Sequence, residues 1–198
     1  MVNSNLPSST ALSEATENLG PDTDTASATL AHILWALGSN PGFQEELFQD
    51  LAVVSFSTDM TTLEGIPRLR ACVKEGIGWT GAAAAMLPRL VPEGEVEFYV
   101  HFLPEKTVIS SSPIWYLHNS VAFLRPKEVD PYRWLMSDGS KVRDDPQRDK
   151  FYIPFSKRAN ICMGAYPRVF RPVELPNRRA SVAAVPIERL VVALEPRL

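Results

Sequence analysis

The sequence predicts a mainly α-helical fold with a small β part, and two observations support this. Three segments in the first 80 residues place apolar side chains three and four positions apart, the spacing that lines one face of a helix. Two short runs of β-forming residues follow, at 96–100 and 107–112. The chain has 198 residues, 45% hydrophobic and 22% charged, which is long enough for one domain with a buried core.

The N-terminal part predicts a lead-in followed by a first helix. Residues 1–20 are polar, so we expect them to be mostly disordered, and Gly20-Pro21 predicts a break. The first helix is expected from about Asp22 to Leu37, with Gly38 as its stop. Its apolar face is predicted to consist of Ala26, Leu30, Ile33, Leu34 and Leu37.

Two further helices are expected before residue 80. Asn40-Pro41 predicts the start of a helix over about 41–54, and residues 55–66 are expected to form a loop. Pro67 opens a third helix that reaches about Trp79, in which Gly76 and Gly78 should weaken the end by roughly 1 kcal/mol each relative to alanine. The inward-facing residues of these two helices are predicted to be Phe43, Leu47 and Leu51 in one and Leu69, Cys72, Val73 and Ile77 in the other.

The second half of the chain is expected to be more irregular. Residues 124–135 are predicted to be a coil punctuated by prolines, and residues 136–150 a charged surface loop with little to bury. The tail is expected to end in a strand over 188–194, rich in β-branched residues. Residues 21–198 would then form one domain after the lead-in.

Charge and cysteine content exclude several classes of partner. The net charge is −3 and no cluster of Lys and Arg appears, so nucleic acid is not expected to bind. The chain has only two cysteines and no signal peptide, so a disulfide framework is not expected. A reducing compartment is favoured, with the cytoplasm as the default location. No apolar run approaches the roughly 18 residues of a membrane span, so no membrane anchor is expected.

The most informative stretch is 154–164, with the sequence PFSKRANICMG. It resembles the haem-thiolate cysteine loop of the cytochrome P-450 family, F-x-x-G-x-R-x-C-x-G, because Phe155, Cys162 and Gly164 have the family spacing. Arg158 stands where the family has Gly, and Asn160 stands where it has Arg. The resemblance implies that Cys162 is the axial ligand of a haem iron and that Phe155 belongs to the haem-binding loop. Taken alone, a single cysteine is more often a buried structural thiol.

Residues 22–27 (DTDTAS) resemble the oxygen-activating helix motif of the same family, A-G-x-D-T-T-S. The resemblance implies that Asp24 and Thr25 are a vestigial acid–alcohol pair, which in the family relays protons. Pro21 and Asp22 replace the two small residues of the motif. The alternative is that these carboxylates and hydroxyls only cap the start of a helix, where such side chains are favoured.

Three more positions follow the family pattern. Residues 71–78 resemble A-C-x-K-E-x-x-R with Glu75 in place and Gly78 instead of arginine, and residues 130–134 resemble F-x-P-x-R-W with Arg133 in place. The resemblance implies that Glu75 and Arg133 form a structural ion pair, since a buried carboxylate needs a partner. Arg89 is similar to the arginine that binds a haem propionate. The alternatives are unrelated surface charges for the pair and a solvated side chain for Arg89.

The resemblance implies that the chain has the fold of the C-terminal part of a cytochrome P-450, of the filamentous-fungal type, with residues 21–198 as a partial domain. Haem is the implied ancestral cofactor. A hydrophobic small-molecule metabolite and an NADPH reductase are the implied partners, and family members are anchored to the endoplasmic reticulum membrane.

We expect the chain to be a truncated family member without monooxygenase activity, derived from an oxidase of secondary metabolism. The replacements at Pro21-Asp22, Gly78, Arg158 and Asn160 favour this expectation, together with the short segment after Cys162, where Pro167 forbids a helix interior. Two alternatives stay open. One is a working haem-thiolate monooxygenase represented by a fragment, and the other is a non-haem binding protein or redox-free catalyst on the same scaffold.

Overall fold

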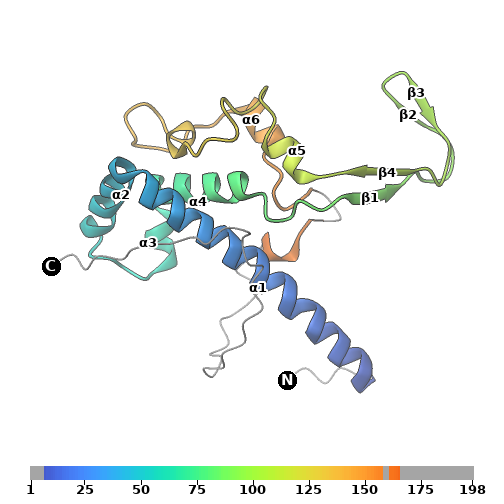
Figure 1. The fold of residues 1–198 in the computed structure, drawn as a ribbon, viewed down its shortest axis with the longest axis horizontal. Helices are drawn as coiled ribbons and strands as arrows, with labels where there is room; N and C mark the ends of the chain where they lie inside the picture. The colour runs from blue at the N-terminus through green and yellow to red at the C-terminus, as the bar shows by residue number, and fades with distance from the viewer. Residues whose placement is uncertain (1–6, 158–160, 166–198) are drawn as a thin grey trace.

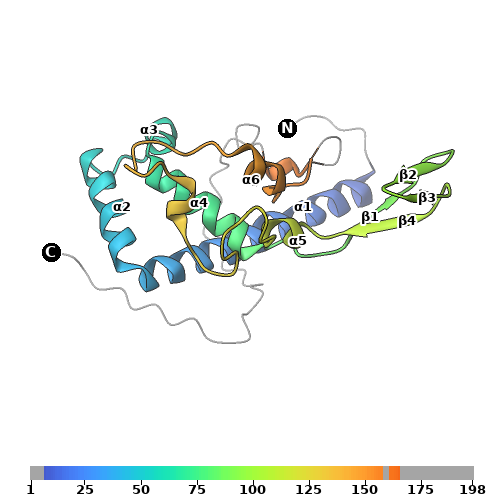
Figure 2. The ribbon, with the colours of Figure 1, turned by 90° about the horizontal axis from the view of Figure 1, so that it is seen from above.

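The computed structural model describes residues 7–157 and 161–165. It confirms a mainly helical fold with a small antiparallel β part (Figure 1). Helices α1, α2 and α4 lie together, while the two β pairs extend away from them (Figures 1 and 2). The elements in chain order are α1 (Ser8–Ser39), α2 (Pro41–Val53), α3 (Met60–Glu64), α4 (Pro67–Thr80), β1 (Leu87–Leu90), β2 (Val96–Phe98), β3 (His101–Leu103), β4 (Val108–Ser111), α5 (Pro113–Leu117), η1 (Pro131–Trp134), α6 (Pro146–Phe151) and η3 (Met163–Ala165).

Helix α1 is longer than predicted. It is one helix of 32 residues that runs through Gly20-Pro21, so the predicted disorder of the lead-in and the break are wrong for residues 8–20. A proline removes one backbone donor, and the residues on both sides of Pro21 still supply enough helical hydrogen bonds to continue the helix. Within the described part of the chain, no helix, α1 included, combines the length and apolarity needed to cross a membrane.

Helices α2 and α4 confirm the predicted second and third helices, but the loop between them contains an unpredicted one. The short helix α3 begins at the Asp59 side chain, which accepts a hydrogen bond of 2.8 Å from the Thr62 amide. This cap stabilises the first turn of a five-residue helix that buries no side chain. Hydrophobic periodicity could not predict α3 because five residues are too few to show a helical period.

The β part contains two antiparallel pairs. Strands β2 and β4 confirm the predicted segments, whereas β1 and β3 were not predicted. Strand β1 pairs with β4, with Leu87 opposite Ser111, and β2 pairs with β3. Pro88 is compatible with β1 because a strand in a two-stranded pair keeps one edge without a partner strand.

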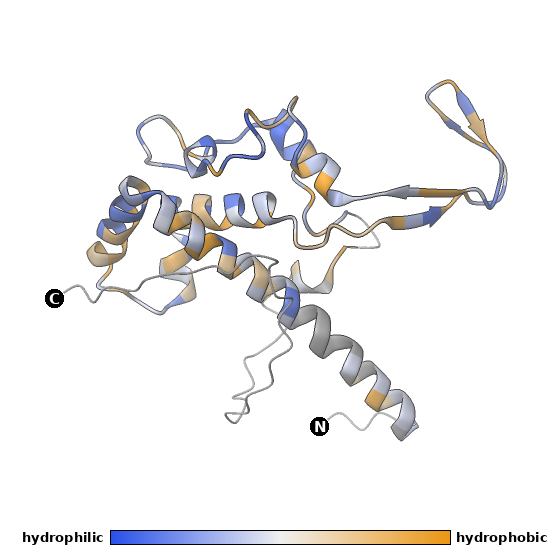
Figure 3. Ribbon diagram, in the orientation of Figure 1, coloured by the Kyte–Doolittle hydropathy of each residue, from blue (hydrophilic) through white to orange (hydrophobic). Residues whose placement is uncertain are grey.

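The core lies where α2, α4 and the segment after α5 meet. In Figure 3, apolar stretches appear on α4 and on the C-terminal half of α1. Ala36 is the buried residue on that half of α1, whereas Leu30 and Leu34 are 57% and 47% exposed, so the predicted face of α1 is only partly covered. Val73 is exposed, contrary to the prediction. The buried cluster consists of Phe43, Leu47, Ala71, Cys72, Phe123, Trp134 and Leu135.

The prediction that segment 136–150 is a surface loop with little to bury is wrong. It contains most of α6, and Arg148 is only 2% exposed. The Arg148 guanidinium donates to the carbonyls of Arg133 (2.8 Å) and Arg143 (2.6 Å) and lies 4.2 Å from the centroid of the Trp134 ring. Carbonyl acceptors and a ring face compensate for the lost hydration of the cation, which composition alone does not reveal.

Some expectations fall on residues outside the described part of the chain. These are the effects of Arg158, Asn160 and Pro167 on the backbone and the strand over 188–194.

Close packing of α1 on α4 depends on Gly76. The residue is buried, and a Cβ at this position would overlap the side chain of Ile33 on α1. Gly76 was expected only to weaken the helix end, yet α4 continues to Thr80 and ends at Gly81, which has a φ of +54°. Gly76 therefore brings the two helices close enough for Ile33 to seat on α4.

We expect Gly76→Ala to lower the free energy of unfolding by about 1–3 kcal/mol, because the added methyl overpacks the contact with Ile33. The matched control is Gly38→Ala on α1, where an added Cβ meets nothing within 4 Å. That change should raise the stability by about 0.5–1 kcal/mol through helix propensity. Denaturant unfolding followed by circular dichroism measures both, and equal effects of the two changes would contradict the packing role.

Candidate functional site

The carboxylate of Glu75 on α4 lies at the centre of the candidate site. Glu75 is 5% exposed, and its Oε1 accepts a hydrogen bond of 2.8 Å from the Asp130 amide. Its Oε2 accepts one of 2.7 Å from Trp134 Nε1 and lies 3.2 Å from Arg133 Nε. The structure thus brings Glu75 and Arg133 together and adds Trp134 as a third donor.

Arg133 connects this carboxylate to the coil that precedes η1. Besides Glu75, its guanidinium donates to backbone carbonyls within residues 124–130, with distances of 2.6 Å to Leu124 and 3.0 Å to Glu128. The Arg133 side chain is only 10% exposed. Arg133 is therefore one of the side chains that hold the coil around residues 124–130 in place, together with Glu75.

Burial favours the neutral form of Glu75, whereas its hydrogen-bond and ion-pair partners favour the ionised form. Burial raises the pKa of Glu75 above its ordinary value, and the Asp130 amide, the Arg133 cation and the Trp134 indole oppose that rise. Each donor satisfies part of the carboxylate, and a buried carboxylate is stable only with such partners. The arrangement is a structural lock, which we call the Glu75 lock and define as Glu75, Asp130, Arg133 and Trp134.

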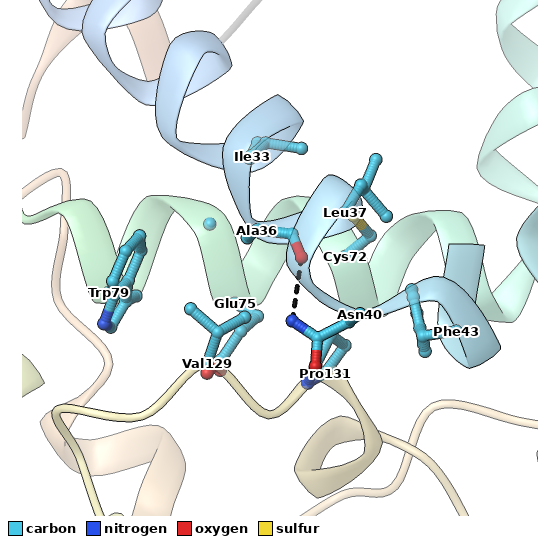
Figure 4. Close-up of a pocket in the computed structure, with 11 residues that line it drawn as sticks. Ile33, Ala36, Leu37, Asn40, Phe43, Cys72, Glu75, Trp79, Val129 and Pro131 are labelled. Carbon is cyan, nitrogen blue, oxygen red and sulfur yellow. Dashed lines mark hydrogen bonds between the residues drawn. The ribbon is translucent and has the colours of Figure 1, made fainter. Parts of the chain in front are cut away.

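A narrow crevice, with little room for more than a water molecule, lies on one side of Glu75, between the C-terminal part of α1, α4 and the coil at 129–131 (Figure 4). Ile33, Cys72 and Val129 are among its lining residues. A second crevice of similar size is lined by Glu75, Gly78 and Arg133 among others. Burial, with the nearby Glu75 charge, raises the pKa of the Cys72 thiol to about 11, so Cys72 is a protonated core thiol.

Cys162 differs from Cys72 because it is exposed. Its amide donates a hydrogen bond of 2.8 Å to the carbonyl of Phe155, and its own carbonyl accepts one of 3.1 Å from the Ala165 amide. The first bond joins Cys162 to Phe155, and the second joins Cys162 to Ala165 at the end of η3. The Phe155 side chain is 37% exposed.

The other predicted site residues lie on separate elements. Arg89 is exposed on β1, where its Nη1 donates to the carbonyl of Pro88 (2.8 Å). Asp24 and Thr25 lie well inside α1, so the alternative that residues 22–24 cap the start of a helix is wrong. The carbonyls of Asp24 and Thr25 accept hydrogen bonds from the hydroxyls of Ser27 and Thr29.

Three side chains in or beside the Glu75 lock, namely Trp134, Tyr152 and Arg148, were not predicted from the sequence. Trp134 directly follows Arg133 in the sequence, so the motif itself contained the signal. Tyr152 packs edge-on against Trp134 with ring centroids 4.8 Å apart, and Arg148 lies over the same indole. The positions of Tyr152 and Arg148 depend on the path of the chain through 136–150, which carries no periodic pattern.

Comparison with known proteins agrees with the family resemblance of the sequence. A family model described as cytochrome P-450 matches residues 3–166. The chain is similar to the cytochrome P-450 monooxygenase asqL of Emericella nidulans, with 32% identity over 158 residues, which cover 77% of this chain and 32% of that protein. It is 33% identical to the cytochrome P-450 monooxygenase penB of Penicillium thymicola (74% of this chain, 33% of that protein) and 29% identical to the fusicoccadiene C-8 hydroxylase of Alternaria brassicicola (82% and 32%). The chain spans about a third of the length of these relatives.

We expect a coupling of about 1–3 kcal/mol between Glu75 and Arg133 in a double-mutant cycle built from Glu75→Gln and Arg133→Met. The reason is that removal of either partner leaves the other charge buried and unpaired. Denaturant unfolding of the four proteins measures the coupling.

A matched control pair is Arg125 and Glu128, which lie 2.7 Å apart with both side chains 60% exposed. Their coupling should be about 0–1 kcal/mol, as for other solvated pairs. Equal coupling in the two cycles would show that burial of Glu75 does not strengthen its interaction with Arg133.

The two thiols should differ sharply in reactivity at pH 8. Cys72 has a pKa of about 11 and is buried, so only a minute fraction is thiolate and little of that is accessible. Cys162 is exposed and should be alkylated at least 100-fold faster, since reaction of Cys72 requires unfolding. Peptide mass spectrometry after timed alkylation separates the two sites, and comparable rates would contradict the burial of Cys72.

Proposed function

Because the chain belongs to the cytochrome P-450 family, we propose that it keeps the structural lock of a haem-thiolate protein but does not work as a monooxygenase. The single observation that supports this most is the pair of replacements in the cysteine loop, Arg158 and Asn160, at the positions where the resemblance has Gly and Arg. A larger residue at a turn that favours glycine strains the backbone around a ligand, and the loss of a cation removes a partner for a haem propionate.

The described residues fit only one part of a haem site. Cys162 has the donor chemistry of an axial thiolate ligand, and its backbone is held by Phe155. The surroundings do not fit, since position 160 carries Asn where the resemblance has a cation, and the Arg89 guanidinium donates to the backbone carbonyl of Pro88. We therefore derive no reaction step through haem for this chain.

A second candidate function is that of a haem-thiolate monooxygenase, which would oxidise a hydrophobic small molecule with electrons from an NADPH reductase. The Glu75 lock and the Phe155–Cys162 hydrogen bond favour this candidate, because both would keep a cysteine loop in one conformation. The printed names of the relatives, two monooxygenases and a hydroxylase, point in the same direction. The third alternative, a non-haem binding protein or redox-free catalyst on the same scaffold, stays open.

We expect the purified chain to bind no stoichiometric haem, because the replacements at 158 and 160 alter the turn around the ligand and remove a cation that would anchor the group. Haem titration followed by reduction under carbon monoxide is the measurement, with Cys162→Ala as the control. The two proteins should give the same spectra.

A thiolate-type, red-shifted Soret band at near-equal occupancy, lost in Cys162→Ala, would support the second candidate instead. The double change Arg158→Gly with Asn160→Arg should not create turnover with a compatible reductase and NADPH. Substrate-dependent oxidation by that variant would show that these two replacements alone account for the missing activity.

A further inference from the structure

The side chain of Tyr152, which directly follows α6, lies in a notch on α4 at Gly78. Gly78 is buried, and a Cβ at this position would lie 3.3 Å from Tyr152 Cε2. This distance is shorter than an ordinary van der Waals contact, so any larger residue at 78 would push the ring outward. The Tyr152 hydroxyl donates a hydrogen bond of 3.1 Å to the carbonyl of Lys74, one turn earlier on α4.

The same ring also contacts the Glu75 lock. Tyr152 and Trp134 pack edge to face, with centroids 4.8 Å apart and an interplanar angle of 68°. The ammonium group of Lys74 lies 5.8 Å from the Tyr152 centroid and 5.1 Å from that of Trp134. Tyr152 is therefore fixed on three sides, by the notch at Gly78, by a helix carbonyl and by the indole of the lock.

Among the described residues, Tyr152 is also the last one before Cys162 that donates a hydrogen bond to α4 and lies against one of its glycines. Phe155, three positions later, accepts the hydrogen bond from the Cys162 amide, and a turn closed by the Ser156 amide on the carbonyl of Ile153 lies between them. Few rotatable bonds separate the fixed ring from the carbonyl that holds Cys162. We propose that Tyr152 is a positioning residue that fixes Phe155, and through its carbonyl Cys162, relative to α4, and that Gly78 is the notch that admits the ring.

This role does not depend on whether haem binds, because every contact that supports it lies within the chain. The hydroxyl remains a donor over the whole neutral range, since burial raises the pKa of Tyr152.

Hydrogen exchange of the Cys162 amide tests the proposal on the full chain by NMR. Tyr152→Phe removes the hydroxyl bond to Lys74 but keeps the ring, so exchange at Cys162 should become about two- to tenfold faster. Tyr152→Ala empties the notch as well and should accelerate exchange by at least tenfold.

The matched control is Tyr132→Phe. Tyr132 donates a hydroxyl bond of 3.2 Å to Glu46 on α2, a bond of similar length away from the cysteine loop. This variant should leave the Cys162 exchange rate unchanged. If Tyr152→Phe lowers the melting temperature without accelerating exchange at Cys162, or if the wild-type amide already exchanges at the rate of an unfolded chain, the positioning role is wrong.

Gly78→Ala provides an independent arm. Alone, it should accelerate exchange at Cys162, because the new methyl displaces the Tyr152 ring. In the Tyr152→Ala background the same change should have no effect at Cys162, since the notch is then empty. Additive effects of the two changes on the exchange rate would show that the residues act separately and would overturn the proposal.

Discussion

The buried carboxylate of Glu75 is the constraint on which the described structure depends. It receives hydrogen bonds from the Asp130 amide and the Trp134 indole and an ion pair from Arg133. A charge removed from water is tolerated only when such partners are in place. The same cation, Arg133, then holds the carbonyls of the preceding coil, so the carboxylate on α4 organises a segment about 50 residues away in the sequence.

Helix α4 can act as this centre because three glycines remove side chains where neighbours approach. A Cβ at Gly76 would overlap Ile33 of α1, and one at Gly78 would crowd Tyr152. Gly81 ends α4 with a φ of +54°, and a Cβ there would overlap Ile114 of α5. Glycine is unfavourable in a helix by about 1 kcal/mol relative to alanine, and close packing on three sides offsets this cost.

The lock and the cysteine loop differ in how much of the family pattern they keep. The lock retains Glu75 and Arg133 and uses Trp134 as a further donor, although Gly78 replaces an arginine of the motif. The loop retains Phe155, Cys162 and Gly164, with replacements at 158 and 160. The lock therefore keeps its interactions within the chain, whereas the loop has replacements at two positions that the resemblance assigns to the haem-binding turn, and this difference is the physical basis of the proposed function.

The sequence by itself determined the type of fold, the positions of α2 and α4, strands β2 and β4, and the family. These follow from local signals, namely apolar spacing, Pro and Gly at helix ends, and motif residues close together in the chain. It also pointed to Glu75 and Arg133 as partners through the family resemblance. Only the tertiary structure decided that α1 continues through Pro21, that β1 pairs with β4, and that Arg148 and Tyr152 reach Trp134. The helix persists through Pro21 because the residues around the proline keep its backbone hydrogen bonds, against the local proline signal. The strand pairing and the contacts to Trp134 depend on contacts between distant segments, whose energy no local pattern records.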